Sequence, residues 1–227
     1  MACGFCVRDW EGMTRKVEPE WLDALSPNDP AAQVNRQDLL HLNRVLGTTR
    51  WFNDVVQRRA SARGRYLEIG AGSGDLGIDL GQHGVEVDGL DLWPAPQDWP
   101  SVRRWHQIDV TRFEGWTDYD GVLANLFLHQ LKDAELRKLG ERILRSKVRL
   151  VVAQEPWRSR WGQGLFLLAA LVFGMGEVSR HDGWVSVRAG FCGDELPHLL
   201  GMASNGWRWQ IEAPILGVYR MVAWRVA

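Results

Sequence analysis

The feature that most constrains this chain is a glycine-rich stretch that follows an apolar run without a break. In "YLEIGAGSGDLGIDL", residues 66–80, four glycines fall within eight residues. Glycine permits a tight turn from a strand into a helix and lets a ligand lie against the backbone. The helix that follows would point its free N–H groups at that ligand. We therefore expect a binding loop at the end of a buried strand.

From residue 65 onward, short apolar runs of strand length alternate with helical patterns. Leu136, Leu139 and Ile143 recur at helical spacing in one of these helices, and Asp133 is its expected N-cap. Alternation of this kind is typical of a parallel sheet covered by helices on both faces. The expected strands are Tyr66–Ile69, Val85–Leu90, Trp105–Ile108, Gly121–Ala124 and Val148–Ala153.

The two ends of the chain differ from this alternation. At the C-terminus, "WRWQIEA" (207–213) alternates apolar and polar residues, and "GVYRMVAWRV" (217–226) follows after a turn, which predicts an antiparallel hairpin closing the sheet. Toward the N-terminus, apolar residues near helical spacing predict a helix that Gly47 interrupts, and a second helix over about 49–59.

The glycines alone leave two ligand classes open. Gly70, Gly72 and Gly74 form G-x-G-x-G, while Gly72, Gly74 and Gly77 also satisfy the dinucleotide pattern G-x-G-x-x-G. Asp91 ends the second strand, 21 residues after Gly70, where a carboxylate can accept from ribose hydroxyls in either case. An oxidoreductase that binds NAD(P) therefore remains an alternative.

Three acidic residues at successive strand ends favour the other class. Glu68 would repel a pyrophosphate and attract an ammonium group, and Asp109 could meet an adenine amino group at the end of the third strand. The loop itself contains no Lys or Arg. Such a crevice suits the cationic sulfonium S-adenosylmethionine (SAM), although each acid could also be a solvated turn residue.

Several stretches resemble the class I SAM-dependent methyltransferase family over roughly residues 60–227. "LEIGAGSGD", "DGLDL", "HQIDV" and "YDGVLANLFLHQL" resemble its first four motifs. The resemblance implies a Rossmann-like, doubly wound α/β sheet of seven strands in the order 3-2-1-4-5-7-6, with an antiparallel last strand. It also implies SAM as methyl donor, S-adenosylhomocysteine as product, and donor contacts from Glu68, Gly70, Ala71, Gly72, Gly74, Asp91, Leu92, Asp109, Val110 and Asn125.

The chain also resembles a narrower bacterial subgroup of methyltransferases, some of which are associated with small-molecule biosynthesis. "EPEWLD", "RQDLLHLN", "EPWRSR" and "HDGWVSVRAGF" carry this likeness over nearly the full length. The subgroup usually shows two consecutive histidines where this chain has His129 and Gln130. We divide the chain into an N-terminal helical cap (1–60) and a SAM-binding domain (61–227) with a lid-like insert at about 156–192.

The acceptor is expected at the carboxyl ends of the fourth and fifth strands. Asn125 can hold the methionine part of the donor or the acceptor, and His129 is the candidate general base, unless it is a structural histidine. Within the insert, "LFLLAALVF" (165–173) predicts an apolar helix that is core, lid or membrane-touching surface. The residues flanking this helix that could contact the acceptor are Trp157, Arg158, His181 and Arg188. The charged ones among them could instead be plain ion pairs.

Composition narrows the class of partner. The formal net charge is −1, and neither a basic stripe nor an N-P-P-Y-type tetrapeptide is present, so we expect no nucleic-acid substrate. No signal peptide or membrane-spanning run is apparent, which predicts a cytoplasmic protein, with peripheral membrane contact open. Cys3 and Cys6 form a lone C-x-x-C, interpreted as two free thiols rather than a metal site.

These observations predict methyl transfer from SAM to a small, rather apolar biosynthetic intermediate. A phenolic or enolic oxygen is the preferred acceptor, with carbon and nitrogen open. The alternatives are the NAD(P)-dependent oxidoreductase and a non-catalytic SAM-binding scaffold. The oligomeric state does not follow from the sequence.

Overall fold

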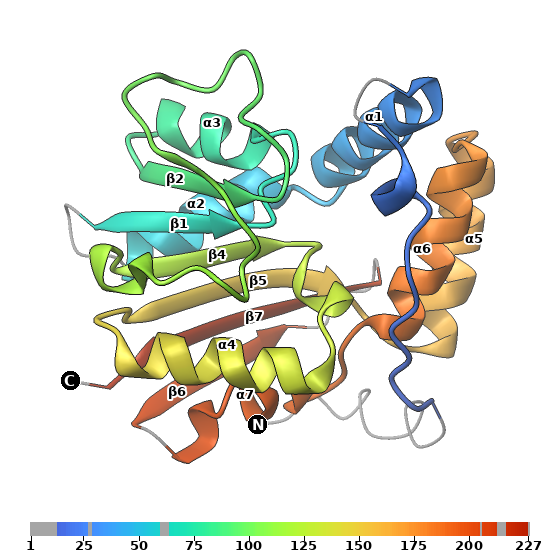
Figure 1. The fold of residues 1–227 in the computed structure, drawn as a ribbon. Coiled ribbons are helices and arrows are strands. Elements are labelled where there is room, and N and C mark those ends of the chain that lie inside the picture. The colour runs from blue at the N-terminus through green and yellow to red at the C-terminus, as the bar shows by residue number, and fades with distance from the viewer. Residues whose placement is uncertain (1–12, 27–28, 60–63, 205, 213–216, 227) are drawn as a thin grey trace.

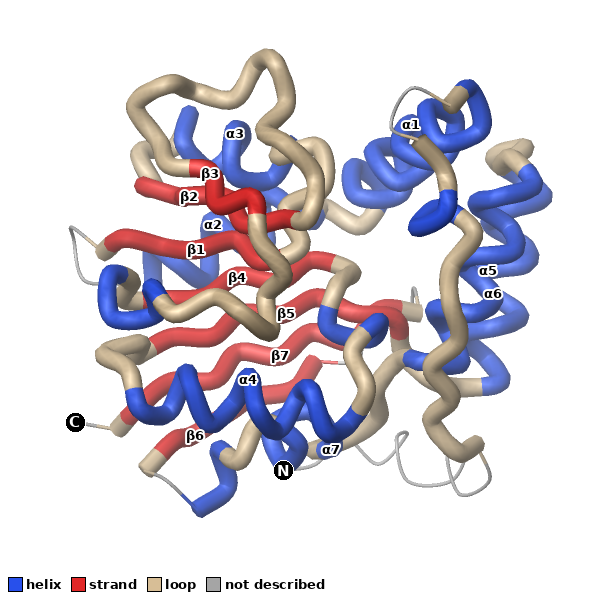
Figure 2. The backbone as a smooth tube through the Cα atoms, viewed as in Figure 1, coloured by secondary structure: helices blue, strands red, loops and turns tan. Residues whose placement is uncertain are grey.

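Seven strands form one mixed sheet with the order β3-β2-β1-β4-β5-β7-β6 (Figures 1 and 2). The computed structural model describes residues 13–26, 29–59, 64–204, 206–212 and 217–226. All neighbouring strands are parallel except β7, which runs antiparallel to β5 and β6. The predicted order and reversed last strand are thus confirmed. The strands are β1 Arg65–Ile69, β2 Glu86–Asp91, β3 Trp105–Gln107, β4 Gly121–Asn125, β5 Leu150–Pro156, β6 Trp207–Glu212 and β7 Val218–Arg225.

Helices cover both faces of the sheet, as the alternating pattern predicted. On one face, Leu136 and Ile143 of α4 pack with Leu196 of α7 in the larger core. On the other face, Phe52 of α2 and Leu80 of α3 pack in a second cluster. The helices are α1 Pro30–Val45, α2 Thr48–Arg59, α3 Asp75–Gln82, α4 Asp133–Arg145, α5 Arg160–Val172, α6 Glu177–Ala189 and α7 Glu195–Leu199, with short 3-10 turns η1 Leu22–Ala24, η2 Gly115–Asp118, η3 Leu128–Gln130 and η4 Met202–Ser204.

The helix boundaries have local causes. Gly47 adopts a φ of 62° between α1 and α2, so the predicted interruption is confirmed. The predicted N-cap of α4 is wrong by one residue: Lys132 is the cap, and the Glu135 carboxylate accepts from its backbone N–H at 2.7 Å. Asp133 is instead the first helical residue, and its carboxylate pairs with Arg15.

Three helices form a separate layer beyond the carboxyl ends of the parallel strands (Figure 1). α6 packs against α1 and α5, and its last turn reaches β5 and η3. Residues 13–26, which we name the strap, run along α6 in the same figure. The strap begins to follow α6 where the Lys16 N–H donates to the Arg188 carbonyl at 3.2 Å. The division into a cap and a SAM-binding domain stays a prediction.

The predicted apolar helix of the insert is α5. Only Gly162 and Ala170 are buried along it, so it is not a core helix. Leu168, Leu171 and Val172 leave 56%, 74% and 70% of their surfaces exposed. Within the described part of the chain, none of the helices combines the length and apolarity needed to span a bilayer.

Candidate active site

Three glycines in the left-handed region turn the chain out of β1. Gly70, Gly72 and Gly74 have φ values of 64°, 55° and 75°, which favour glycine over any residue with a Cβ. A Cβ on Gly72 would meet nothing within 4 Å, whereas one on Gly70 would lie 2.1 Å from the Phe127 ring. The turn therefore leaves open space over Gly72, where a ligand could lie against the backbone.

Asp91, at the end of β2, lies beside this turn. Its Oδ2 accepts from the Gly72 N–H at 2.8 Å, and its Oδ1 accepts from the Trp93 N–H at 3.0 Å. The Ala71 N–H donates to the Leu90 carbonyl at 3.1 Å. These bonds fix the glycine turn and the Asp91 carboxylate relative to each other, as a ribose-binding role requires.

Glu68 lies on β1 beneath α3 rather than free in the loop. Its side chain is 3% exposed, and its Oε2 has no hydrogen-bond partner. Burial raises the pKa of Glu68 to about 8. The nearby Gly77 backbone amide lowers this pKa, while repulsion from Asp75 and Asp91 raises it further. The expected full negative charge at this position is therefore mostly neutralised near pH 7 without a ligand. That oxygen faces α3, where a Cβ added at Gly77 would lie 2.9 Å from it.

The other predicted donor residues flank the turn. The Thr111 hydroxyl donates to Asp109 Oδ1 at 2.7 Å and lowers the pKa of that carboxyl. Val110 is buried in the larger core, while Leu92 is 65% exposed. Gly74 lies under the ring of Trp99, where an added Cβ would come within 2.8 Å of Cε3. These donor contacts stay predictions.

Asn125 ends β4 within a polar network from five elements, β4, β5, β7, α1 and α2. Its amide nitrogen donates to Asn43 at 3.3 Å, and its oxygen accepts from Gln154 at 3.1 Å. Gln154 also donates to Thr48 at 2.8 Å and accepts from Arg220 at 2.9 Å. The network fixes the carboxyl ends of β4 and β5 against α1 and α2.

The two residues after Asn125 contact different parts of the candidate site. Leu126 has a φ of 55°, unusual for a residue with a γ-branched side chain, and its N–H donates to the Gln154 carbonyl at 2.7 Å. Outliers of this kind cluster where a structure fixes functional side chains. Leu126 lines a pocket on the α1, α5 and α6 side, whereas the next residue, Phe127, packs on Gly70.

His129 is buried between two carboxylates. Its Nδ1 lies 2.7 Å from Glu155 and its Nε2 lies 3.2 Å from Glu20. Burial would lower the pKa of His129, but the hydrogen bonds and charges of Glu155 and Glu20 raise it to about 9. In this arrangement the ring is an imidazolium with both nitrogens engaged. A role as general base, still a prediction, would require it first to lose its proton.

The strap supplies Glu20 and is itself held by Arg15. The Arg15 guanidinium donates to the carbonyls of His129 and Leu131 at 2.8 and 2.7 Å, and to Ala189 at 2.8 Å. Glu20 also accepts from Ser186 and, at 3.1 Å, from Gln130. The strap, η3 and α6 therefore form one hydrogen-bonded unit around His129.

An apolar pocket lies beside this unit, with a volume of about 170 Å³. It is enclosed by the strap, α1, α5, α6 and the ends of β4 and β5. Its apolar walls come mainly from α1 and α5, including Leu39, Leu42, Leu165, Phe166 and Ala169. Its polar lining residues are Glu20, Asn35, Asp38, His129, Gln130, Ser179, Asp182 and Ser186.

The four candidates for acceptor contact lie around this pocket without lining it. Arg158 is buried in an ion pair with Glu195, and Arg188 pairs with Glu18 at 2.8 Å. His181 stacks on Trp21 of the strap with ring centroids 3.8 Å apart. Trp157 forms an isolated bridge with Phe191. Their contact with an acceptor stays a prediction.

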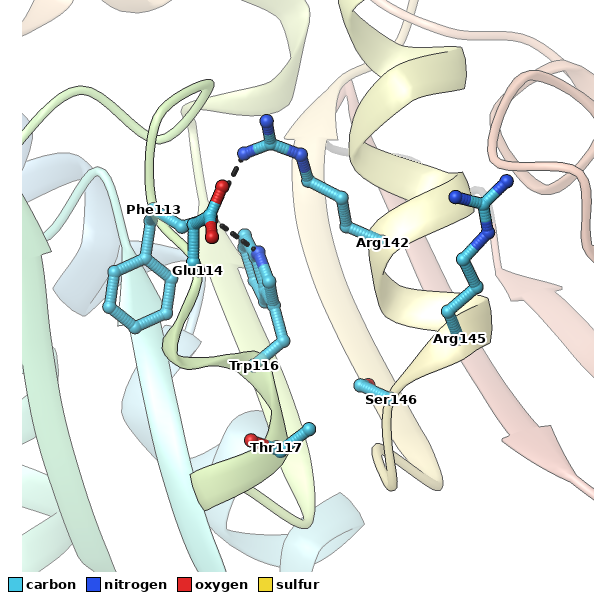
Figure 3. Close-up of a pocket in the computed structure, with 7 residues that line it drawn as sticks. All are labelled: Phe113, Glu114, Trp116, Thr117, Arg142, Arg145 and Ser146. Atoms are coloured by element: carbon cyan, nitrogen blue, oxygen red, sulfur yellow. Dashed lines mark hydrogen bonds between the residues drawn. The ribbon is translucent and has the colours of Figure 1, made fainter.

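A second hollow, of about 210 Å³, lies at the opposite end of the sheet (Figure 3). The Phe113 carbonyl accepts there from Trp116 at 2.8 Å and from Arg142 at 2.9 Å. Because η2 leads into β4 and the end of α4 leads toward β5, this hollow is at the amino ends of the strands. It therefore belongs to neither the glycine turn nor the apolar pocket.

The structure describes one of the three cysteines of the chain. Cys3 and Cys6 lie outside the described residues, whereas Cys192 is buried and its Sγ donates to the Arg158 carbonyl at 2.7 Å. Among the residues that the structure describes, no three His, Cys, Asp or Glu side chains group as metal ligands would.

Comparison with known proteins places this geometry in context. No family model and no curated protein matches the chain. Solved structures do: the plantazolicin methyltransferase BpumL in complex with SAH is 12% identical, covers 88% of this chain and 92% of its own, and has a TM-score of 0.68. The chain has the class I SAM-dependent methyltransferase fold.

Two further structures support this fold. The plantazolicin methyltransferase BamL, in complex with a triazolic desmethylPZN analog and SAH, is 9% identical over 90% of this chain and 92% of its own, with a TM-score of 0.70. The magnesium protoporphyrin IX methyltransferase ChlM of Synechocystis PCC 6803, with bound SAH, is 16% identical over 90% and 91%, with a TM-score of 0.51. The family resemblance predicted from the motifs is confirmed at the level of this fold.

Sequence reasoning missed the residues that surround His129 and the pocket. Glu20 lies 109 positions from His129, and Glu155 lies 26 positions from it, so no local pattern relates them. Glu155 offered one signal, because it is an acid near the carboxyl end of a parallel strand, like Asp91. Asn35 and Asp38, from α1, offered none.

Proposed function

We propose that the chain is an enzyme that transfers a methyl group from SAM to a small, rather apolar acceptor. The observation that carries this proposal is the glycine turn at the end of β1. Three glycines there have positive φ, Asp91 accepts from the Gly72 N–H, and Glu68 of the same strand is buried with an unpartnered oxygen. The methyltransferase fold and the adjoining apolar pocket support the same conclusion.

The residues present fit the donor. Gly70, Ala71, Gly72 and Gly74 would offer backbone against which it lies, and Asp91 would accept from its ribose hydroxyls. Glu68 would accept from its α-ammonium group. The other residues proposed to contact the donor are Leu92, Asp109, Val110 and Asn125. When bound, SAM supplies an electrophilic methyl group on a sulfonium. What the chain contributes is mainly the positioning of acceptor and donor and the exclusion of water.

The acceptor is proposed to enter the apolar pocket. Leu126 lines that pocket and follows Asn125 directly, so the pocket adjoins the donor side of the sheet. The sequence favoured a phenolic or enolic oxygen with carbon and nitrogen open. An oxygen acceptor must lose its proton to react, and His129, the candidate base, is engaged by Glu20 and Glu155.

A binding screen tests the donor directly. Calorimetric titration with SAM, S-adenosylhomocysteine, NAD and NADP should give saturable binding for the first two alone. Tight binding of NAD or NADP without SAM would favour the oxidoreductase. Binding of SAM with no labelled product, in extracts of the native cell supplied with radiolabelled donor, would favour the non-catalytic scaffold.

The variant Asp91→Ala tests the site. It removes the ribose acceptor and the bond to the Gly72 N–H, so donor affinity should fall by about tenfold to a hundredfold. Asp98→Ala is the matched control, because Asp98 is exposed in the connection that follows β2. Equal donor affinity in the two variants, with the far-UV spectrum intact, would remove Asp91 from the site.

A further inference from the structure

The polar lining of the apolar pocket is acidic. Glu20, Asp38 and Asp182 contribute three carboxylates, and His129 is the one histidine among the described lining residues. Neither Lys nor Arg occurs among those lining residues. Each carboxylate has donors from the protein: Asp38 accepts from the Ser179 hydroxyl at 2.6 Å, and Asp182 accepts from the Trp21 and Leu22 N–H groups at 2.7 and 2.9 Å. These bonds fix the carboxylates in place, and two of them also face histidines: Glu20 lies 3.2 Å from His129 Nε2 and Asp182 lies 2.9 Å from His181 Nδ1.

Asn35 adds an independent observation that points to a ligand. It lies on α1, is 3% exposed and lines the pocket, and its side-chain oxygen has no hydrogen-bond partner. A buried acceptor without a partner costs about 1–3 kcal/mol, and such groups are uncommon in folded proteins. An N–H or O–H group on a molecule in the pocket would satisfy it. The pocket therefore presents an unpartnered acceptor beside three carboxylates, with neither Lys nor Arg among its described lining residues.

The surroundings of His129 favour nitrogen over oxygen as the atom that accepts the methyl group. A phenol or enol must lose its proton to react, and both ring nitrogens of His129 are hydrogen-bonded to carboxylates. An amine also attacks only after its ammonium form has lost a proton, but the attacking amine is neutral, whereas a phenolate or enolate is an anion that the carboxylates would repel. Positive charge develops on the attacking nitrogen, and the carboxylates of the pocket stabilise that charge.

We propose that the methyl acceptor is a hydrophobic amine, held with its body against α1 and α5 and its N–H group on Asn35. This inference rests on the proposed methyl transfer and specifies its substrate class. An ammonium form would first release a proton to water. The nitrogen lone pair then forms the N–C bond as the methyl–sulfur bond breaks, and sulfur keeps the bonding pair. The methylated ammonium that results can release a further proton to water.

A matched set of ligands tests the proposal on the full chain. Phenylalkylamines with chains of two to five carbons are compared with the corresponding alcohols and carboxylates, and with 4-butylphenol. Binding is measured by calorimetry in saturating S-adenosylhomocysteine, so that no turnover is needed. The best amine should bind about tenfold tighter than its alcohol and than the phenol. The carboxylates should give no measurable binding.

Two variants identify the groups responsible. Asn35→Leu removes the unpartnered oxygen, so it should weaken amine binding about tenfold without lowering the melting temperature. Asp38→Asn removes one charge and keeps an oxygen for Ser179 and Gly176, so it should narrow the preference for amine over alcohol. Asp54→Asn is the control, because Asp54 lies on α2 in an exposed pair with Arg58.

The outcomes separate this inference from the proposed function. A carboxylate or phenol that binds as tightly as the amine overturns the amine proposal, and so does a failure of every amine to bind while S-adenosylhomocysteine binds. Unchanged amine affinity in Asn35→Leu also overturns it. Failure of S-adenosylhomocysteine itself to bind contradicts the proposed methyl transfer instead.

Discussion

At the scale of single residues, the glycines of the turn have separable roles. Gly72 and Gly84 both have positive φ, 55° and 80°, and an added Cβ meets nothing within 4 Å at either. Gly72→Ala and Gly84→Ala should therefore cost similar strain, about 1 kcal/mol each. Because the ligand is proposed to lie over the turn that contains Gly72 and not over Gly84, only Gly72→Ala of these two variants should weaken SAM binding by calorimetry. Equal donor affinity in the two variants would mean that the space over Gly72 is not the donor site.

Glu68 gives a second residue-scale prediction, on pH. Its pKa is raised from 4.5 to about 8 in the folded protein, so the folded state binds the proton more tightly than the unfolded state. Stability should therefore fall as the pH rises from about 5 to about 8. Glu68→Gln removes this loss, so it should match the native protein near pH 5 and exceed it by a few kcal/mol near pH 8.

Thermal melts across that range provide the measurement for Glu68. Glu141→Gln is the control, because Glu141 is exposed on α4. The other buried groups, including His129, titrate alike in all three proteins and cancel in the differences. A difference between native protein and Glu68→Gln that stays constant with pH would contradict the raised pKa.

At the scale of elements, the strap is the segment whose attachment the acceptor pocket most depends on. The Arg15 side chain is 9% exposed and holds carbonyls of η3 and α6 together with Asp133. Arg15→Ala should lower the melting temperature by about 5 °C or more, since it removes charged hydrogen bonds from buried carbonyls. It should weaken amine binding through Glu20 while leaving S-adenosylhomocysteine affinity unchanged.

The strap prediction has a matched control in Arg58→Ala. Arg58 side-chain exposure is 73%, and its pair with Asp54 at 3.6 Å is a surface pair. Such pairs contribute about 0–1 kcal/mol, so the melting temperature should hardly change. If Arg15→Ala reduced donor and acceptor affinities equally, the strap would belong to the whole domain rather than to the pocket.

The elements also show which parts of the site a sequence can predict. β1, the glycine turn and Asp91 are local: an apolar run, glycines and an acid at a strand end, each readable within a few positions. The terminal hairpin was equally clear from its alternation. The acceptor pocket was not, because Glu20 comes from the strap, Asn35 from α1 and Asp182 from α6, and their convergence depends on how these three segments pack. Glu68 lies on the first strand as predicted, but its burial beneath α3 and its raised pKa depended on packing that the local sequence does not show.

At the scale of the whole molecule, the proposed donor and acceptor sites are joined by consecutive residues. The Leu126 side chain lines the acceptor pocket, and Phe127 packs on Gly70 of the donor turn. The backbone between them is fixed by Glu155, whose Oε1 accepts from the Phe127 and Leu128 N–H groups at 3.2 and 2.9 Å. A ligand that shifts Phe127 at the glycine turn should therefore also shift Leu126, which lines the acceptor pocket.

This connection predicts reciprocal binding between the two sites. S-adenosylhomocysteine should change the affinity of the best phenylalkylamine about fivefold or more, and the amine should change S-adenosylhomocysteine affinity by the same factor. Phe127→Ala removes the side chain that contacts Gly70, so the factor should approach one, while Phe173→Ala, at an exposed position after α5, should leave it unchanged. Calorimetric titrations of each ligand with and without the other give both factors. Independent binding in the native protein, or an undiminished factor in Phe127→Ala, would show that the two sites are not coupled through this residue.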